Sequence, residues 1–168
     1  LAEVRAAEIP VVVSMGSVAA SGGYWIAAEA DEIWALPTTI TGSIGAFSAF
    51  PTIEGVIDYI GVKVDGLGTT PLAGAASLNR GLSPEMSNIV QALSYGAYED
   101  FIELVAAGRN MTDADVREIA EGIVWIGADA AEIGLVDQLG GLQQAVESAA
   151  ALAGVDQWRT GRTQVPPS

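Results

Sequence analysis

The sequence predicts an α/β fold with a mostly parallel sheet flanked by helices. Short apolar runs that suit strands alternate with helical patterns along the chain, and this order places a helix between neighbouring parallel strands. The run Val11–Met15 shows no alternation of apolar and polar residues, which is typical of a parallel strand buried on both faces. Half of the 168 residues are apolar, so the chain can build the core of one ordinary domain.

Boundary residues locate the elements expected in the first part of the chain. Pro37 stops the strand before it, because proline has no N–H for a ladder. Gly61 is the expected C-cap of the helix before it. In chain order, we expect a helix end at 2–8, a strand at 11–15, a helix at 22–30, a strand at 32–35, a glycine-bracketed turn at 41–45, a helix at 52–60 and a strand at 62–64.

Capping residues mark the helices of the second part. Residues 66–82 lack periodicity and predict a loop or lid. Ser83 and Pro84 are a preferred N-cap and first helical residue. Thr112 and Asp115 have the spacing of a capping box, with Asp in the usual place of Glu. The expected elements are helices at 83–107 and 112–121, a strand at 123–125, a helical turn at 128–132, a strand end at 134–137 and a helix at 142–153.

Composition excludes several kinds of function. The net charge of −14 disfavours binding to nucleic acid or to anionic lipid by charge alone. The chain has no cysteine and no histidine, which removes thiolate chemistry, disulfides, Cys-type zinc sites and the imidazole base. We therefore expect no cofactor and no metal. No apolar run is long enough to span a membrane, and we expect no signal peptide in this segment. The chain starts without Met, in a pattern typical of a mid-helix segment, so we expect it to be part of a longer protein.

Ser21 is the leading candidate for a catalytic residue. It follows an apolar strand and small residues, and it precedes Gly22, Gly23 and a helical pattern. This order of strand, tight turn, serine and helix exposes a hydroxyl and directs helix N-terminal amides, that of Gly22 first, toward the same place. The simpler interpretation is that Ser21 caps the helix, since serine is a favoured N-cap residue.

A nucleophilic serine in this chain needs a base other than histidine. Lysine can serve only as the neutral amine, which requires burial. The one lysine, Lys63, is expected to face outward from its strand. Glu29, Asp31 and Glu32 form a group that fits a solvated surface better than a catalytic pair. A second hydroxyl often orients the lysine of a serine–lysine pair, and Ser43 could do so if its turn lies beside Ser21.

These motifs resemble the signal peptide peptidase A family, also called protease IV. The similarity covers about residues 9–158. The segments that carry it are Val11–Trp25, Pro37–Gly45, Ile60–Val62, Val124–Ala130 and Gly134–Gly141. The resemblance implies the crotonase-like α/β spiral that the proteolytic subunit of Clp protease shares. Residues 1–156 would then form a single crotonase-like peptidase domain, and residues 157–168 a polar tail or linker.

The resemblance also implies an activity and a setting. Family members are serine–lysine peptidases that degrade cleaved signal peptides at the membrane and assemble into homo-oligomers. This implies peptide substrates and a location at the periplasmic face of the bacterial inner membrane, through an anchor outside this chain. The matching residues imply that Ser21 is the nucleophile, that Ser43 orients the base lysine and that the Gly22 N–H helps to hold the oxyanion.

The chain departs from the family at the base. Short members carry the lysine in the loop that matches residues 68–75, which contains none here. Long members take it from an N-terminal domain of similar fold. The resemblance therefore implies the C-terminal half of a long member, which would be inactive alone. Two alternatives remain at this point: an acyl-CoA enzyme of the crotonase type and a non-catalytic domain that builds an oligomer.

Overall fold

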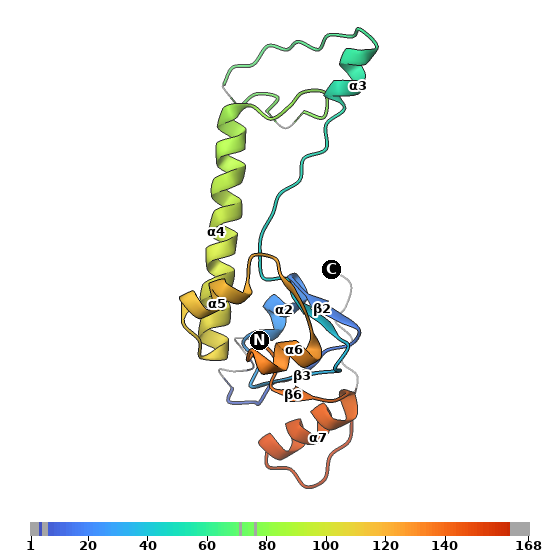
Figure 1. Ribbon diagram of the computed structural model, residues 1–168, viewed down its shortest axis with the longest axis vertical. Helices are drawn as coiled ribbons and strands as arrows, with labels where there is room; N and C mark the ends of the chain where they lie inside the picture. The colour runs from blue at the N-terminus through green and yellow to red at the C-terminus, as the bar shows by residue number, and fades with distance from the viewer. Residues whose placement is uncertain (1–3, 5–6, 71, 76, 162–168) are drawn as a thin grey trace. The chain divides into compact units, whose positions relative to one another are not determined.

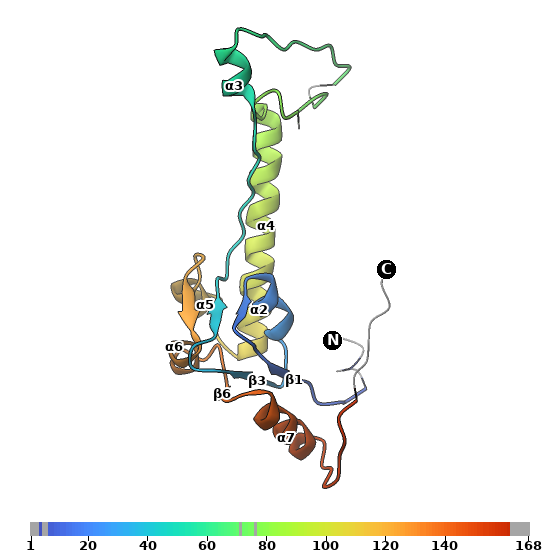
Figure 2. The same ribbon diagram turned by 90° about the vertical axis from the view of Figure 1, so that its right-hand side faces the viewer.

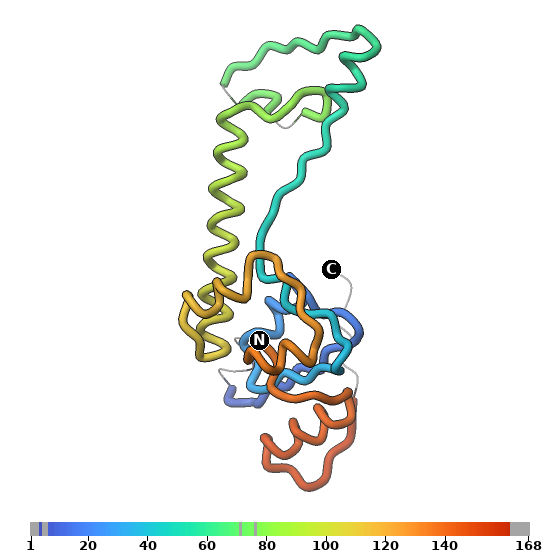
Figure 3. Tube along the Cα trace, in the orientation of Figure 1, coloured from blue at the N-terminus to red at the C-terminus, as the bar shows by residue number. Residues whose placement is uncertain are grey.

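The computed structural model describes residues 4, 7–70, 72–75 and 77–161 (Figures 1 and 3). Contacts divide the chain into two compact units. One unit combines residues 1–44 with residues 102–168, and we call it the sheet unit. The other comprises residues 45–101, and we call it the inserted unit.

The described residues of the sheet unit form short strands and several helices. The strands are β1 (Val12–Ser14), β2 (Val18–Ala20), β3 (Glu32–Ala35), β4 (Ile40–Gly42), β5 (Val124–Ile126) and β6 (Gln138–Leu139). The helices are α2 (Gly22–Ala27), the end of α4 (Pro84–Arg109), α5 (Asp113–Ile119), α6 (Gly127–Glu132) and α7 (Leu142–Leu152).

These strands form two three-stranded sheets. The first has the order β1-β3-β6, with every pair parallel. The second has the order β2-β4-β5, in which β2 and β4 are parallel and β4 and β5 are antiparallel. The connection from β2 through α2 to β3 takes the chain from one sheet to the other. The predicted α/β class, with mostly parallel strands and flanking helices, is confirmed.

The core of the sheet unit lies around the first sheet. Helix α7 lies along one side of the β1-β3-β6 sheet and α2 on the other (Figures 1 and 2). Ile33 and Ala35 are fully buried in β3, and Tyr24 and Ala28 are fully buried at α2. Burial of each large apolar side chain stabilises the fold by about 1.5–3 kcal/mol. This buried core can hold the loops at the strand ends of the sheet unit in fixed positions.

The inserted unit has a different character. It contains α3 (Glu54–Tyr59) and about the first five turns of α4, joined by segments without regular structure. An extended segment, residues 46–52, runs beside the first part of α4 (Figures 1 and 3). Among the described residues 45–101, only Ala75 and Phe101 are buried.

Several predictions of local structure are confirmed. The strand expected at 32–35 is β3. The hydroxyl of Ser83 accepts the N–H of Met86 over 3.2 Å, as expected of a helix cap. Thr112 and Asp115 form the predicted capping box. In both helix caps the signal is a contact between residues three apart in the sequence.

Other predictions are wrong. Residues 62–64 form no strand. Ala19 and Ala20, expected in the tight turn before Ser21, belong to the strand β2. The strand end expected at 134–137 is displaced to Gln138–Leu139, and the helix predicted to Ala30 ends at Ala27. A strand requires a hydrogen-bonded partner as well as a suitable composition, and that partner is set by the tertiary fold.

Some predictions are outside what the structure tests. The helix end at 2–8 and the final part of the tail fall largely on residues outside the described ranges. The division into a domain at 1–156 and a tail at 157–168 stays a prediction. No helix in the described part of the chain combines the length and apolar character needed to cross a bilayer.

Candidate active site

The strands β2 and β4 bring Ser21 and Ser43 to the same edge of a sheet. In the last pair of this parallel ladder, Ala20 lies opposite Gly42. Ser21 and Ser43 are the next residues of the two strands, and the Ser21 N–H donates to the Gly42 carbonyl over 2.9 Å. Neighbouring parallel strands lie about 4.8 Å apart, so the two serines follow adjacent strand ends. The sequence left open whether the turn that holds Ser43 lies beside Ser21, and the structure places it there.

Both serines have a strained backbone. Ser21 and Ser43 each have φ 52, and Ser21 has ψ −120. A residue other than glycine in such a region costs on the order of 1–3 kcal/mol, and it persists only where the surrounding structure holds it. A strained serine on a sharp strand-to-helix turn is also the geometry that exposes a nucleophile above a sheet.

The hydroxyl of Ser21 does not cap α2. Ser21 occupies the N-cap position, but its side chain accepts no hydrogen bond from that helix. At α5, by contrast, the Thr112 hydroxyl accepts the N–H of Asp115 over 3.2 Å. Ser21 is therefore the N-cap residue by position, but the side-chain hydrogen bond that capping would provide is absent. Ser21 and Gly22 are exposed, and a Cβ added at Gly22 would meet no atom within 4 Å, so the hydroxyl is open to a reactant.

The antiparallel strand β5 supports the turn at Ser43. The Ser43 N–H donates to the Ile123 carbonyl over 2.7 Å, and the Gly122 N–H donates to the Ile44 carbonyl over 3.0 Å. Gly42 has φ 71, and a Cβ there would lie 2.7 Å from Cδ1 of Trp125. Glycine is required at residue 42, because both the backbone conformation and the indole ring exclude a side chain. Ser43 itself is half-buried.

Helix α2 is anchored on its buried side. The Tyr24 hydroxyl donates to the Leu135 carbonyl over 2.8 Å, and burial raises the pKa of Tyr24 well above its usual value. A Cβ on Gly108 would lie 2.1 Å from the Ala28 carbonyl oxygen, so the end of α4 packs directly against the α2 terminus. These contacts fix the helix whose first residue is Gly22.

Lys63 is exposed and ion-paired. Its Nζ lies 2.7 Å from Oδ1 of Asp58, and its side chain is 80% exposed. It lies in a segment without regular structure in the inserted unit. The expectation that Lys63 faces solvent is confirmed, although the strand expected to carry it is absent. Burial, which a lysine base requires, is missing at this side chain.

The acidic group after α2 has structural partners. Oδ2 of Asp31 accepts the Val11 N–H over 2.7 Å. Oε2 of Glu32 accepts the Trp34 indole N–H over 2.8 Å and the hydroxyl of Ser148. These bonds attach the chain before β1 and helix α7 to β3, so the two carboxylates serve the fold. No group of His, Cys, Asp and Glu able to hold a metal ion occurs among the described residues.

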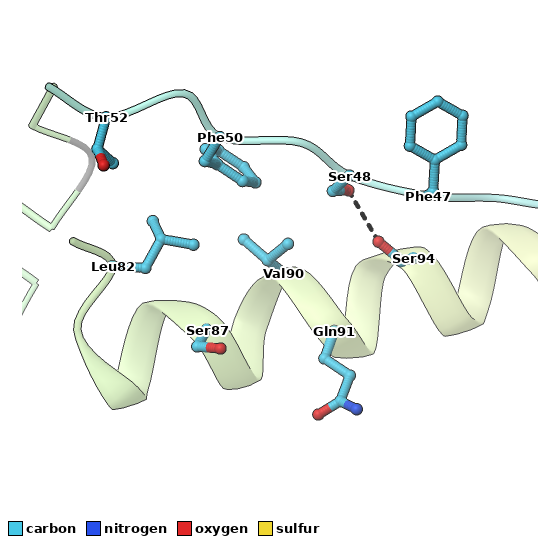
Figure 4. Close-up of a pocket in the computed structure, with 9 residues that line it drawn as sticks. All are labelled: Phe47, Ser48, Phe50, Thr52, Leu82, Ser87, Val90, Gln91 and Ser94. Atoms are coloured by element: carbon cyan, nitrogen blue, oxygen red, sulfur yellow. Dashed lines mark hydrogen bonds between the residues drawn. The ribbon is translucent and has the colours of Figure 1, made fainter.

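A separate groove lies within the inserted unit. It has a volume of about 590 Å³. The groove runs between the extended segment 46–52 and the first turns of α4, where the hydroxyls of Ser48 and Ser94 lie 2.8 Å apart (Figure 4). Phe50, Val90 and Leu82 give it an apolar part. The groove holds no pair of groups suited to nucleophilic catalysis.

Sequence reasoning missed what holds the two serines. The strand β2, the required Gly42 and the buried Thr41 have no role in the predicted site. The motif Thr41–Gly45 did contain a signal, since the glycines of a turn are typical of demanding backbone conformations. The pairing of β2 with β4 has no local signal.

Comparison with known proteins decides the family. The model of peptidase family S49 matches residues 3–156. The chain belongs to peptidase family S49. A protein named Protease 4 from Salmonella typhi is 48% identical over the whole of this chain, which spans 27% of that protein. A candidate signal peptide peptidase, SppA, from Enterococcus faecium is 35% identical over 88% of this chain, which covers 43% of that protein.

These matches confirm the predicted resemblance. The S49 chain spans well under two thirds of the length of either relative. Among solved structures, a candidate enoyl-CoA hydratase/isomerase family protein from Hyphomonas neptunium is 16% identical, with a TM-score of 0.42. The matched region covers 86% of this chain and 38% of the Hyphomonas neptunium chain. A TM-score this low carries no argument about activity, so it does not favour an acyl-CoA enzyme.

Proposed function

We propose that this chain carries the nucleophile half of a serine–lysine peptidase. Ser21 is the nucleophile, Ser43 orients the base lysine, and the Gly22 N–H stabilises the oxyanion. The observation that carries the proposal is the pairing of β2 with β4. It places two serines, each with a positive φ, directly after adjacent strand ends. Membership of a peptidase family supplies the reaction class.

The chemistry follows from the two hydroxyls and an amine. A neutral lysine amine takes the proton of Ser21 Oγ as that oxygen bonds to the carbonyl carbon of the peptide. The resulting oxyanion faces the Gly22 N–H. The C–N bond then breaks, and the lysine ammonium returns the proton to the leaving amine. Water activated by the same amine hydrolyses the acyl-enzyme and restores Ser21.

The base in this proposal comes from outside the chain. The sequence holds one lysine, and Lys63 is exposed and paired with Asp58. We therefore place the base on an N-terminal domain of a longer protein. Small residues around Ser21 favour unhindered apolar peptides, so signal peptides are the proposed substrates. Homo-oligomerisation and attachment to the periplasmic face of the bacterial inner membrane, through a segment outside this chain, belong to the same proposal.

A complementation assay tests the origin of the base. The isolated chain, the N-terminal portion of the longer protein and their mixture are each incubated with an apolar fluorogenic peptide. We expect cleavage by the mixture and by the intact protein, and little by either part alone. Strong cleavage by the isolated chain would refute an external base. A Ser21→Ala variant of the intact protein is the control, and it should lose peptide cleavage if Ser21 is the nucleophile. A hydratase activity, measured with an acyl-CoA, would survive this change because backbone amides polarise the thioester.

A further inference from the structure

We propose that Thr41 is a positioning residue that fixes Ser21 beside Ser43. This inference rests on the proposed function and adds a residue to it. Thr41 lies in the middle of β4, opposite Ala19 of β2. Its side chain is fully buried, and its hydroxyl donates to the Ala19 carbonyl over 2.8 Å. A side chain of β4 thus adds a hydrogen bond to the backbone pairing of β4 with β2.

The length of the strands makes this extra bond important. β2 and β4 have three residues each, so only a few ladder bonds fix their register. The Ile40 N–H donates to the Ser17 carbonyl, and the Ser21 N–H donates to the Gly42 carbonyl, each over 2.9 Å. The hydrogen bond from Thr41 to Ala19 lies between these two backbone bonds. Thr41 is two residues before Ser43, and Ala19 is two residues before Ser21.

Register decides which residue is the neighbour of Ser21. A slip of one residue would place Gly42 or Ile44 beside Ser21 and would turn side chains to the opposite face. Both serines also have unfavourable backbone conformations, which the strands before them must hold against relaxation. Thr41 therefore acts on the reaction through the relative position of two hydroxyls, without touching the substrate.

The chain offers a matched control for this proposal. Thr39 is also fully buried, and its hydroxyl donates to the Gly16 carbonyl over 2.8 Å and accepts the Leu36 N–H over 3.0 Å. It lies before β4, at the end of the β2–β4 pair away from the serines. Thr39→Val and Thr41→Val each remove one buried hydroxyl at nearly constant volume.

The experiment measures the rate at which a peptide phosphonate labels Ser21 in the intact longer protein, together with the melting temperature of each variant. Both valine variants should melt at lower temperature. Only Thr41→Val should slow labelling, by about tenfold or more, because small misplacements of reacting groups reduce rates strongly. Thr41→Ser, which keeps the hydroxyl, should restore the rate.

Equal labelling rates for the Thr39→Val and Thr41→Val variants would overturn the positioning role. If Thr41→Val does not fold, Thr41→Ser and Thr41→Ala provide the same comparison, since both lose the methyl group and differ only in the hydroxyl. Equal rates for that pair would also overturn the role. Failure of the proposed function itself is distinct: label would then persist in Ser21→Ala at the rate of the unsubstituted protein.

Discussion

The two units of this chain bury their apolar residues to different extents. In the sheet unit, apolar side chains such as Ile33, Ile102 and Leu135 are fully buried. In the inserted unit, Phe47 and Tyr59 are each 91% exposed. Apolar burial is the main source of stability in a folded protein. The sheet unit therefore gains substantial stability from its own buried side chains, and the inserted unit gains little. The strained serines lie in the unit that has a core.

This contrast shows why the candidate site can exist where it does. Holding Ser21 and Ser43 in left-handed conformations costs free energy, which packing and hydrogen bonds nearby must offset. The contacts that do so come from β4, β5, α2 and the end of α4. All of them belong to the sheet unit. The contrast predicts different responses of the two units to substitution.

The largest difference is expected in catalysis. Ser21→Ala in the intact longer protein should lower kcat by roughly a thousandfold or more, because the nucleophile is removed. Lys63→Gln should leave kcat and KM unchanged, since this exposed side chain pairs only with Asp58 in the proposed account. Steady-state cleavage of an apolar peptide measures both. A loss of activity in Lys63→Gln comparable to that in Ser21→Ala would move the base into this chain.

Hydrogen exchange should separate the units next. Amides of β2, β3 and β4 are in ladders of a unit with a buried core, whereas those of 54–70 lie in a short helix and a loop with exposed side chains. We expect exchange to be about 100-fold or more slower in the strands, because local opening there approaches global unfolding. Mass spectrometry of peptic fragments measures this. Similar protection in the two sets would contradict the contrast.

Two glycine substitutions sharpen the comparison further. Gly42→Ala forces a Cβ to within 2.7 Å of the Trp125 ring at φ 71 and should lower the free energy of unfolding by about 2–3 kcal/mol. Gly55→Ala, in α3, meets nothing within 4 Å and should be neutral or stabilise its helix by up to about 1 kcal/mol. Denaturant unfolding of both variants gives the values. Equal effects would show that packing around β4 is loose.

The capping box of α5 gives the smallest effect. Thr112→Ala should lower the free energy of unfolding by about 1 kcal/mol, which denaturant unfolding measures.

The same capping box should make stability depend on pH. The hydroxyl and N–H of Thr112 donate to Asp115 and lower the pKa of that carboxyl below its usual value of 3.8. A lowered pKa in the folded state means that this contribution is present above pH 3.8 and is lost as the pH falls through the folded value. Melting temperatures of Asp115→Asn and the unsubstituted chain should therefore converge in acid; a constant gap would contradict this.

The sequence predicted the local features and missed those that depend on distant pairing. Ser83 and Thr112 cap their helices as expected, because the partners lie within three residues. Ser21 and Ser43 were predicted as site residues from the residues around them, and the structure sets them after adjacent strand ends. The strand β2 was missed because three small or apolar residues form a strand only through pairing with β4. The strand expected at 62–64 failed for the same reason, since composition alone does not provide a partner.

The backbone of the serines was also beyond sequence reasoning. Gly42 could be suspected of a positive φ, but Ser43 and Ser21 adopt one without being glycine. Their conformation results from the β2–β4 ladder and from β5, which pairs with β4 although it lies far along the chain, at residues 124–126. The exposure of Lys63 was predicted correctly, although for a strand that does not form.

Site-resolved labelling by a serine-reactive phosphonate tests the central claim most directly. The intact longer protein and the isolated chain are treated side by side, and the modified peptide is located by mass spectrometry. The account predicts label on Ser21 in the intact protein and almost none in the isolated chain over the same time. Equal labelling of the isolated chain, or label on another serine, would contradict a nucleophile at Ser21 activated by an amine from outside these 168 residues.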